Sequence, residues 1–368
     1  MKNLVMPALL IVPVTVGALW VFSGNQSETE AALPKEAAQD SISQRTSAAL
    51  RKDAGSRVGR GPFVAPTECS DPLACVVQNH VDLKAGPGVV DAACGARSYD
   101  EHQGVDFRIL DLPTMMSGVP VVAVADGTVI GARDGEFDGA WLAKGREVVK
   151  DRDCGNGISI EHADGYVTQV CHLKRDSVLV EEGDTVKQGQ RIGSVGMSGR
   201  AEFPHVHLSV TKDGRRVDPF TGLQVGNGRD CGQATGESLW AGVVPDHWQP
   251  SAGPFIFKSG FTAEPVNLAM IERRPSNPVA ASPALAFYAR AVGLQKGDVE
   301  KIELTGPDGF EPIGSVGSPL AKGKAQIMRF VGRPAKGEPL PTGEYQGRYQ
   351  ILRGGEPVLD ISRNFVLE

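Results

Sequence analysis

Short runs of apolar residues, separated by turns that contain glycine, fill most of the chain between residues 67 and 245. Residues 119–135, VPVVAVADGTVIGARDG, predict two strands joined by an Asp-Gly turn. Residues 157–173, GISIEHADGYVTQVCHL, predict a second hairpin of the same kind, and residues 180–196 predict a short strand between two turns. The pattern therefore predicts a mainly β fold, with an antiparallel sheet in the region 67–245.

The last third of the chain has a different pattern, with longer alternating stretches at roughly regular spacing. Examples are FIFKSGFTA at residues 255–263, ALAFYARAVGL at 284–294 and GEYQGRYQIL at 343–352. Such spacing, with turn residues between the stretches, predicts a C-terminal β-sandwich of immunoglobulin-like type over residues 250–368. This region contains no histidine and no cysteine. We therefore expect it to be a spacer or packing module rather than a ligand-binding domain.

The chain begins with one lysine and then an uncharged apolar run over residues 4–22. Residues 1–24 are predicted to be a signal peptide or a membrane anchor, and either would export the rest of the chain. The length of the run and the lack of an A-x-A cleavage site favour an uncleaved anchor, which would tether the protein to the membrane. Residues 25–66 are small, polar and charged, and they predict a flexible linker.

Length and charge narrow the class of protein. A chain of 368 residues suggests about two globular units plus extensions. The formal net charge of -6 gives no sign of a polyanion-binding surface, so nucleic acid is not an expected partner.

The six cysteines fit an oxidising compartment, and no C-x-x-C motif occurs to suggest a zinc knuckle or a thioredoxin-like site. Cys154 and Cys171 flank the second predicted hairpin, so we expect them to form a disulfide between neighbouring strands. Cys69 and Cys75 could close a short loop, which would leave the remaining two as a third pair, Cys94 and Cys231.

Two separated segments carry residues that could bind a metal. In EFPHVHLSV, residues 202–210, the two-residue period of a strand places His205 and His207 on one face and apolar residues on the other. In YDEHQGVDFRI, residues 99–109, His102 and Asp106 would share a face with Gly104 between them, and glycine leaves room for an ion. Two such strands facing each other could bring these side chains together.

Three nitrogen and oxygen ligands would come from His102, Asp106 and one of the pair His205 and His207. Such a set suits a catalytic zinc ion, with a fourth position left for water. No H-E-x-x-H motif supplies a glutamate base. A histidine is therefore expected to take this role. The candidates are the member of the H-x-H pair that does not bind zinc, and His172.

These motifs resemble the lysostaphin-type, or LytM-type, zinc endopeptidases that cut peptide cross-links in bacterial cell walls. The likeness rests on His102-Gln-Gly-Val-Asp106, on GNGISIEHADGY, on GDTVKQGQRIGSVGMSG and on Pro204 before the histidine pair, and it covers about residues 95–220. It implies one zinc ion bound by His102, Asp106 and His207, with His172 and His205 as catalytic residues that do not bind the metal. It further implies peptides of peptidoglycan as the substrate and the periplasm or cell envelope as the location.

Two features depart from the family pattern. Val170 stands where the family usually has a tyrosine, two residues before the middle histidine. The polar insertion at residues 135–153, expected to be a loop or short helix outside the sheet, is longer than in compact relatives. Some relatives have lost zinc ligands, so the alternative function is an inactive wall-binding or hydrolase-activating protein of the same fold. A zinc peptidase acting on glycine-rich proteins is a third possibility.

The other histidines have no partner at metal-binding spacing. His162 is expected to be a turn residue, and His80 and His247 are expected to be surface residues or histidines with satisfied hydrogen bonds.

Overall fold

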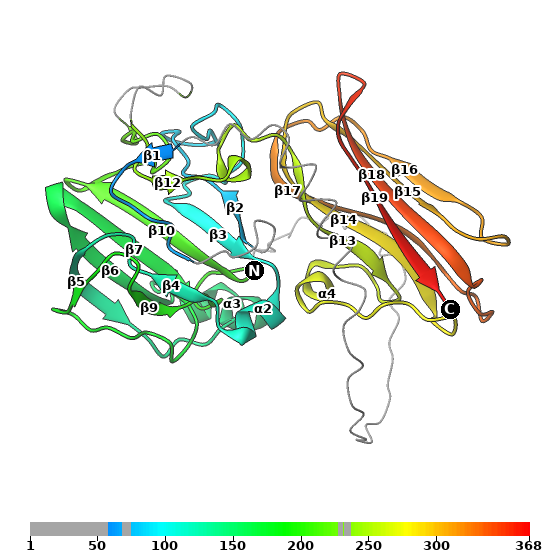
Figure 1. Cartoon of the computed structure of the whole chain (residues 1–368), viewed down its shortest axis with the longest axis horizontal. Coiled ribbons are helices and arrows are strands. Elements are labelled where there is room, and N and C mark those ends of the chain that lie inside the picture. The colour runs from blue at the N-terminus through cyan, green and yellow to red at the C-terminus, as the bar shows by residue number, and fades with distance from the viewer. Residues whose placement is uncertain (1–57, 68–74, 227–230, 232–236) are drawn as a thin grey trace, which may run out of the picture. The chain divides into compact units, whose positions relative to one another are not determined.

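Antiparallel strands form most of the described part of the chain (Figure 1). The computed structural model describes residues 58–67, 75–226, 231 and 237–368, and the statements below concern these residues. The expected mainly β, antiparallel fold is confirmed. None of the helices in the described ranges is long and apolar enough to cross a membrane. The predicted signal or anchor at residues 1–24 lies outside the described residues.

The largest sheet in the described residues has eight strands and carries Asp106, His172, His205 and His207 of the candidate site. The strand order is β2-β3-β10-β7-β6-β5-β8, with β11 paired to β10. The strands are β2 (Cys75–Asn79), β3 (Val105–Ile109), β5 (Gly127–Arg133), β6 (Asn156–His162), β7 (Tyr166–Leu173), β8 (Thr185–Val186), β10 (His205–Lys212) and β11 (Arg215–Arg216). The alternation expected for β3 and β10 is present, because Val105, Phe107, Val206 and Leu208 are fully buried in one apolar core.

Smaller elements surround this sheet. They are β1 (Val58–Arg60), paired to β12 (Ala241–Val243); β4 (Pro120–Val122), paired to β9 (Arg191–Ser194); the helices α2 (Leu112–Ser117) and α3 (Ala140–Lys144); and the 3-10 turns η1 (Arg146–Val149), η2 (Ala163–Gly165) and η3 (Asp246–Trp248). The polar insertion at residues 135–153 contains α3 and η1, in agreement with the expected loop or short helix.

Two expectations about this region are wrong. The first predicted hairpin does not form, because β4 pairs with β9 while β5 pairs with β6 and β8. The flexible linker predicted for residues 25–66 also extends too far towards the C-terminus. Its last residues include β1, and Phe63 is 1% exposed within the main core, so this stretch gains both backbone pairing and apolar burial.

Two sheets form the C-terminal region and enclose a second apolar core. One has the order β13-β14-β17 and the other the order β16-β15-β18-β19. Their bounds are β13 (Phe255–Thr262), β14 (Ala284–Leu294), β15 (Val299–Thr305), β16 (Ile313–Val316), β17 (Lys324–Pro334), β18 (Gly343–Arg353) and β19 (Glu356–Leu367), with α4 (Leu268–Glu272) between β13 and β14. Phe287 and Ala289 of the first sheet share this core with Tyr345 and Tyr349 of the second, which supports the sandwich.

Polar and apolar contacts join the C-terminal region to the eight-stranded sheet. Val76 packs with Phe257 and Val292 in a small buried cluster. Asp111, the N-cap of α2, accepts hydrogen bonds from Lys258 and Arg274 at 3.1 and 3.0 Å. These contacts connect β13 and the segment after α4 to the segment that follows β3.

Two of the predicted disulfides are present. Cys154 bonds to Cys171 across the start of β6 and the end of β7, and Cys94 bonds to Cys231. Cys69 lies outside the described residues, so the predicted pair with Cys75 stays a prediction.

Candidate metal centre

Strand pairing brings the two predicted metal-binding segments side by side in one sheet, rather than on two strands that face each other. In the antiparallel register of β3 and β10, Asp106 lies opposite His207, and His205 lies opposite Arg108. His102 precedes β3, and its ring lies 4.9 Å from that of His207. The backbone alternation that buries Phe107 and Val206 on one face therefore places these polar side chains together on the other.

The closest cluster consists of one atom from each of three residues. Nε2 of His102 lies 3.1 Å from Oδ1 of Asp106 and 3.1 Å from Nδ1 of His207, and the last atom lies 2.9 Å from the same carboxylate oxygen. Candidate ligand atoms of the three residues all lie within 4.8 Å of one another. This is the donor set, two imidazoles and one carboxylate, that binds zinc in many catalytic sites.

The hydrogen bonds around these residues fit a cation. Nδ1 of His102 donates to the carbonyl oxygen of His80 at 2.7 Å, so a neutral His102 presents the lone pair of Nε2 to Asp106. Asn79 donates to the other carboxylate oxygen of Asp106 at 2.7 Å. A lone pair and a carboxylate oxygen that face each other repel unless a proton or a metal ion lies between them, so the arrangement fits zinc.

Gly104 gives the cluster its space. A β-carbon at this position would lie 2.6 Å from Nε2 of His207 and 2.4 Å from the carbonyl oxygen of Leu208. Any larger side chain would thus push the His207 ring or the β10 backbone out of place. The sequence expectation that glycine leaves room here is in agreement with this geometry.

His172 and His205 lie beside the cluster, with their ring centres 4.7 Å apart. Nδ1 of His172 donates to the carbonyl oxygen of Ser198 at 2.8 Å, and Nδ1 of His205 donates to that of Phe203 at 2.8 Å. In each neutral ring the proton is therefore on Nδ1, and Nε2 is left as a proton acceptor. Nε2 of His205 lies 3.5 Å from Oδ1 of Asp106, further than the nitrogens of His102 and His207.

The backbone of His172 is unusual, because its φ of 64° lies in the left-handed region, which β-strand residues rarely adopt. Its N–H donates to the carbonyl oxygen of Cys154 at 2.8 Å, and the neighbouring Cys171 is disulfide-bonded to the same Cys154. The disulfide and this hydrogen bond together hold the main chain at His172.

Burial sets the protonation of the site. It lowers the pKa of His172 well below its ordinary value and also lowers the pKa of His205, so both rings are neutral at pH 7. Burial opposes the ionisation of Asp106, yet the neighbouring His102 and His205 hold the pKa of this carboxyl well below its usual range. The site thus combines an ionised Asp106 carboxylate with the neutral imidazoles of His172 and His205.

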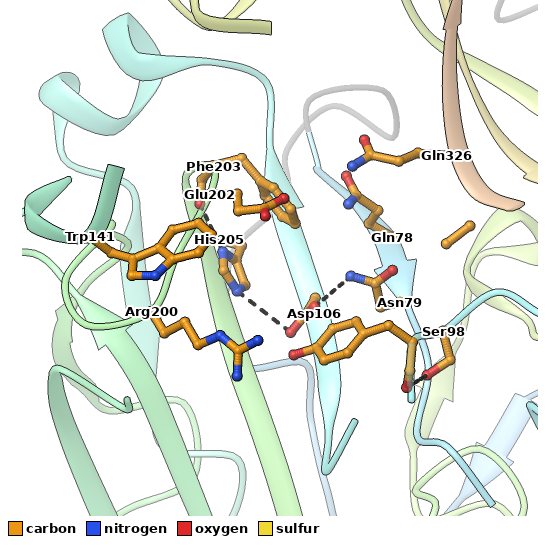
Figure 2. Close-up of a pocket in the computed structure, with 12 residues that line it drawn as sticks. Gln78, Asn79, Ser98, Asp106, Trp141, Arg200, Glu202, Phe203, His205 and Gln326 are labelled. Atoms are coloured by element: carbon orange, nitrogen blue, oxygen red, sulfur yellow. Dashed lines mark hydrogen bonds and ion pairs between the residues drawn. The ribbon is translucent and has the colours of Figure 1, made fainter. Parts of the chain in front are cut away.

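A cavity of about 370 Å³ opens beside these residues. Figure 2 shows Asp106 and His205 in its wall, with Trp141 and Arg200 on one side and Gln78, Asn79 and Gln326 on the other. Trp141 belongs to α3, so the polar insertion forms part of the cavity wall. Gln326 belongs to β17 of the C-terminal region.

All five predicted site residues lie in this one region, although their separate roles stay predictions. Sequence reasoning missed two supporting groups, the amide of Asn79 and the carbonyl of His80. No sequence pattern indicates them, since one contact comes from the main chain and the other depends on strand pairing. The expectation for His80 is wrong. This residue is fully buried, and its ring nitrogens have no hydrogen-bond partner in the described part of the chain.

Comparisons with known proteins agree with this geometry. The profile of peptidase family M23 matches residues 100–219. The peptidoglycan DD-endopeptidase ShyA of Vibrio cholerae is 32% identical over 117 residues, which cover 32% of this chain and 22% of ShyA. The DD-carboxypeptidase/endopeptidase Mpg of Neisseria meningitidis is 31% identical over 120 residues, 33% of this chain and 22% of Mpg. The chain thus spans about a fifth of the length of these relatives.

Solved structures of the same type also match. The catalytic domain of lysostaphin from Staphylococcus simulans is 27% identical, with 32% of this chain and 76% of that chain covered and a TM-score of 0.25. A TM-score this low adds no argument of its own. The sequence matches confirm the expected resemblance: residues 100–219, which carry His102, Asp106, His172, His205 and His207, are similar to peptidase family M23.

Proposed function

We propose that this protein is an exported zinc metalloendopeptidase that hydrolyses peptide bonds in the stem peptides or cross-links of peptidoglycan. The observation that carries the proposal is the convergence of Nε2 of His102, Oδ1 of Asp106 and Nδ1 of His207, with His172 and His205 beside them. The relative ShyA, a peptidoglycan DD-endopeptidase, supports the choice of substrate. The predicted N-terminal signal or anchor and the disulfides support export to the periplasm or cell envelope.

His102, Asp106 and His207 would hold one zinc ion. The ion would act as a Lewis acid that polarises a water molecule and the carbonyl group of the scissile peptide bond. Two neutral imidazoles remain for the proton transfers that amide hydrolysis requires.

His172 and His205 would move these protons. Because Nδ1 of each ring is bonded to a main-chain carbonyl, each Nε2 is free to accept a proton. One ring would take a proton from the attacking water and later deliver it to the leaving amide nitrogen. Nε2 of the other ring would accept a hydrogen bond from the attacking water and so orient it.

Digestion of purified sacculi, followed by mass spectrometry of the soluble products, tests the proposal. We expect peptide bonds to be cut by the zinc-loaded protein, and we expect cleavage to stop when a chelator removes the metal. A properly folded protein that contains zinc yet releases no peptide fragments would contradict the proposal and favour the wall-binding or hydrolase-activating alternative. Fragments released equally by the His172→Ala variant would contradict the assigned mechanism.

A further inference from the structure

The cavity beside the metal centre has a wall that belongs to the C-terminal sandwich. Gln326 of β17 lines it together with Gln78 and Asn79 of β2. This finding differs from the expectation that the sandwich takes no part in ligand binding. Figure 2 shows the side chains of Gln326 and Gln78 on the side of the cavity opposite Trp141 and Arg200.

A β-bulge aims Gln78 into the cavity. In the pairing of β2 with β3, Val77 lies opposite Phe107 and Asn79 lies opposite Asp106, so Gln78 is an extra residue without a partner. Successive strand residues normally point to opposite faces of a sheet. The bulge removes this alternation locally, and both Gln78 and Asn79 line the cavity.

Arginine side chains fix the orientation of both glutamine amides. Nη1 of Arg108 donates to Oε1 of Gln78 at 2.8 Å, and Nε of Arg290 donates to Oε1 of Gln326 at 2.9 Å. Arginine can only donate, so the oxygen of each amide must face the guanidinium and the NH₂ group must point away from it. Neither NH₂ group has a hydrogen-bond acceptor among the described residues. The cavity is thus supplied with two unused donors.

The network behind these amides carries a net positive charge. Arg108 is fully buried and Arg290 is 2% exposed, and both donate to the same oxygen of Glu272. Two guanidinium groups against one carboxylate leave an excess of one positive charge in a region of low dielectric. Among the other charged residues that line the cavity, Arg200 offsets Glu202, which also interacts with Arg290, and the carboxylate of Asp106 belongs to the candidate metal centre.

Aromatic rings hold this network in place. The guanidinium of Arg108 lies 4.2 Å from the ring centre of Phe203 and 4.6 Å from that of Phe257. Phe203 precedes the H-x-H strand, and Phe257 belongs to β13 of the sandwich. The position of Gln326 relative to the metal centre is therefore fixed by buried contacts rather than by a surface loop.

We propose that Gln78 and Gln326 form a subsite for a carboxylate group of the peptide substrate, so that the sandwich helps to determine specificity. Two amide N–H donors would bind the carboxylate oxygens, and the excess charge of the arginine pair would favour an anion over a neutral amide. The inference rests on the proposed function, because it concerns the peptide that the metal centre would cleave.

The test compares one cross-linked muropeptide dimer in two forms, with free carboxylates and with the carboxylates converted to amides. The variant Gln326→Glu keeps an oxygen for Arg290 but replaces the donor with a second carboxylate oxygen. Gln346→Glu makes the same charge change at an exposed position on β18 of the same sandwich, and it serves as the matched control. Zinc content and thermal midpoint are measured for each protein to exclude misfolding.

For the wild type and Gln346→Glu, we expect KM to be about tenfold lower for the free form than for the amidated form, with kcat within twofold. Gln326→Glu should lose this preference, through a rise of about tenfold in KM for the free form. The inference would be overturned if Gln326→Glu kept a preference within twofold of that of the wild type, or if the wild type itself showed no preference. In either case, cleavage of the peptide would still support the proposed function.

Calorimetric binding gives a readout that does not need cleavage. The two muropeptide forms are titrated into zinc-loaded His172→Ala and into His172→Ala combined with Gln326→Glu. The subsite would be supported if the first protein bound the free form more tightly and the second protein did not. This would hold even if the wild type cleaved neither form, because a lack of cleavage would overturn only the proposed function. Equal Kd values for both forms in both proteins would overturn the subsite.

Discussion

The ring centres of His172 and His205 lie 4.7 Å apart, and Nδ1–H of each ring donates to a main-chain carbonyl. By contrast, a ring nitrogen of His102 and one of His207 each lie within 3.1 Å of the same oxygen of Asp106. This geometry supports the proposed roles of His172 and His205 as catalytic residues and of His102 and His207 as metal ligands. We expect His172→Ala to keep its zinc and to lose about 10² to 10⁴ in kcat, because it removes a proton-transfer group. His102→Ala should lose both zinc and activity.

Metal analysis of the purified variants, together with the rate of muropeptide cleavage, checks this separation. His162→Ala is a suitable control, since this buried histidine bonds to Asp126 and Thr168 away from the cluster. Loss of zinc from His172→Ala, with a thermal midpoint equal to that of wild type, would contradict the assignment.

Gly104→Ala should weaken metal binding, because the added β-carbon would lie 2.6 Å from Nε2 of His207. We expect the zinc Kd to rise by at least tenfold, as is typical when the support of a metal ligand is disturbed. Gly131→Ala is the matched control, because nothing lies within 4 Å of the β-carbon it would add. Competition with a chromogenic chelator gives both values, and equal zinc affinity in the two variants would refute the role of Gly104.

The Cys154–Cys171 disulfide should support catalysis as well as stability. Replacing both cysteines with alanine frees the main chain at His172, whose φ of 64° is held by the adjacent bond to Cys154. We expect kcat to fall with zinc retained, and the free energy of unfolding to fall by about 3 kcal/mol for a loop of this size.

Removal of the Cys94–Cys231 pair is the control for the disulfide experiment, because it closes a different loop. It should lower stability and leave kcat of the remaining folded protein near that of wild type. Equal losses of kcat in the two double variants would show that Cys154–Cys171 has no special effect on His172.

Asp111 should stabilise the protein above about pH 4. Burial opposes its ionisation, but hydrogen bonds from Arg274 and Thr114 and the charge of Lys258 lower its pKa to about 2, compared with 3.8 in the unfolded chain. Because the folded-state pKa is depressed, the stabilisation is present above pH 4 and is lost as the pH falls towards 2. Wild type should exceed Asp111→Asn by about 2 kcal/mol at pH 7.

Urea unfolding at pH 7, 5 and 3.5 measures this difference, and asparagine retains the N-cap oxygen of α2, so the comparison isolates the charge. The gap between the two proteins should be constant from pH 7 to 5 and narrower at pH 3.5. A gap that widens towards acid would contradict the assigned ion pairs with Lys258 and Arg274.

Much of the metal centre could be predicted because it depends on local strand periodicity. Alternation alone places His205 and His207 on one face of β10. His102 and Gly104 were expected on the same strand as Asp106 but precede β3, so strand periodicity does not explain their position. The second hairpin was predictable for the same reason, since its turn and both of its strands are adjacent in the sequence.

Features that depend on distant pairing could not be predicted. The strand β4 has the composition of a hairpin partner for β5, yet its backbone pairs with β9. The bulge at Gln78 arises from register with β3, and the Arg108–Glu272 ion pair joins residues 164 positions apart. No sequence pattern marks such contacts, and they are the ones that connect the sandwich to the cavity.

Anomalous diffraction at the zinc edge, from crystals of the purified protein, tests the central claim most directly. The account predicts one peak per chain, about 2.0–2.2 Å from Nε2 of His102, Oδ1 of Asp106 and Nδ1 of His207. A zinc-replete crystal with no peak at these three atoms, or with its zinc bound elsewhere, would contradict it.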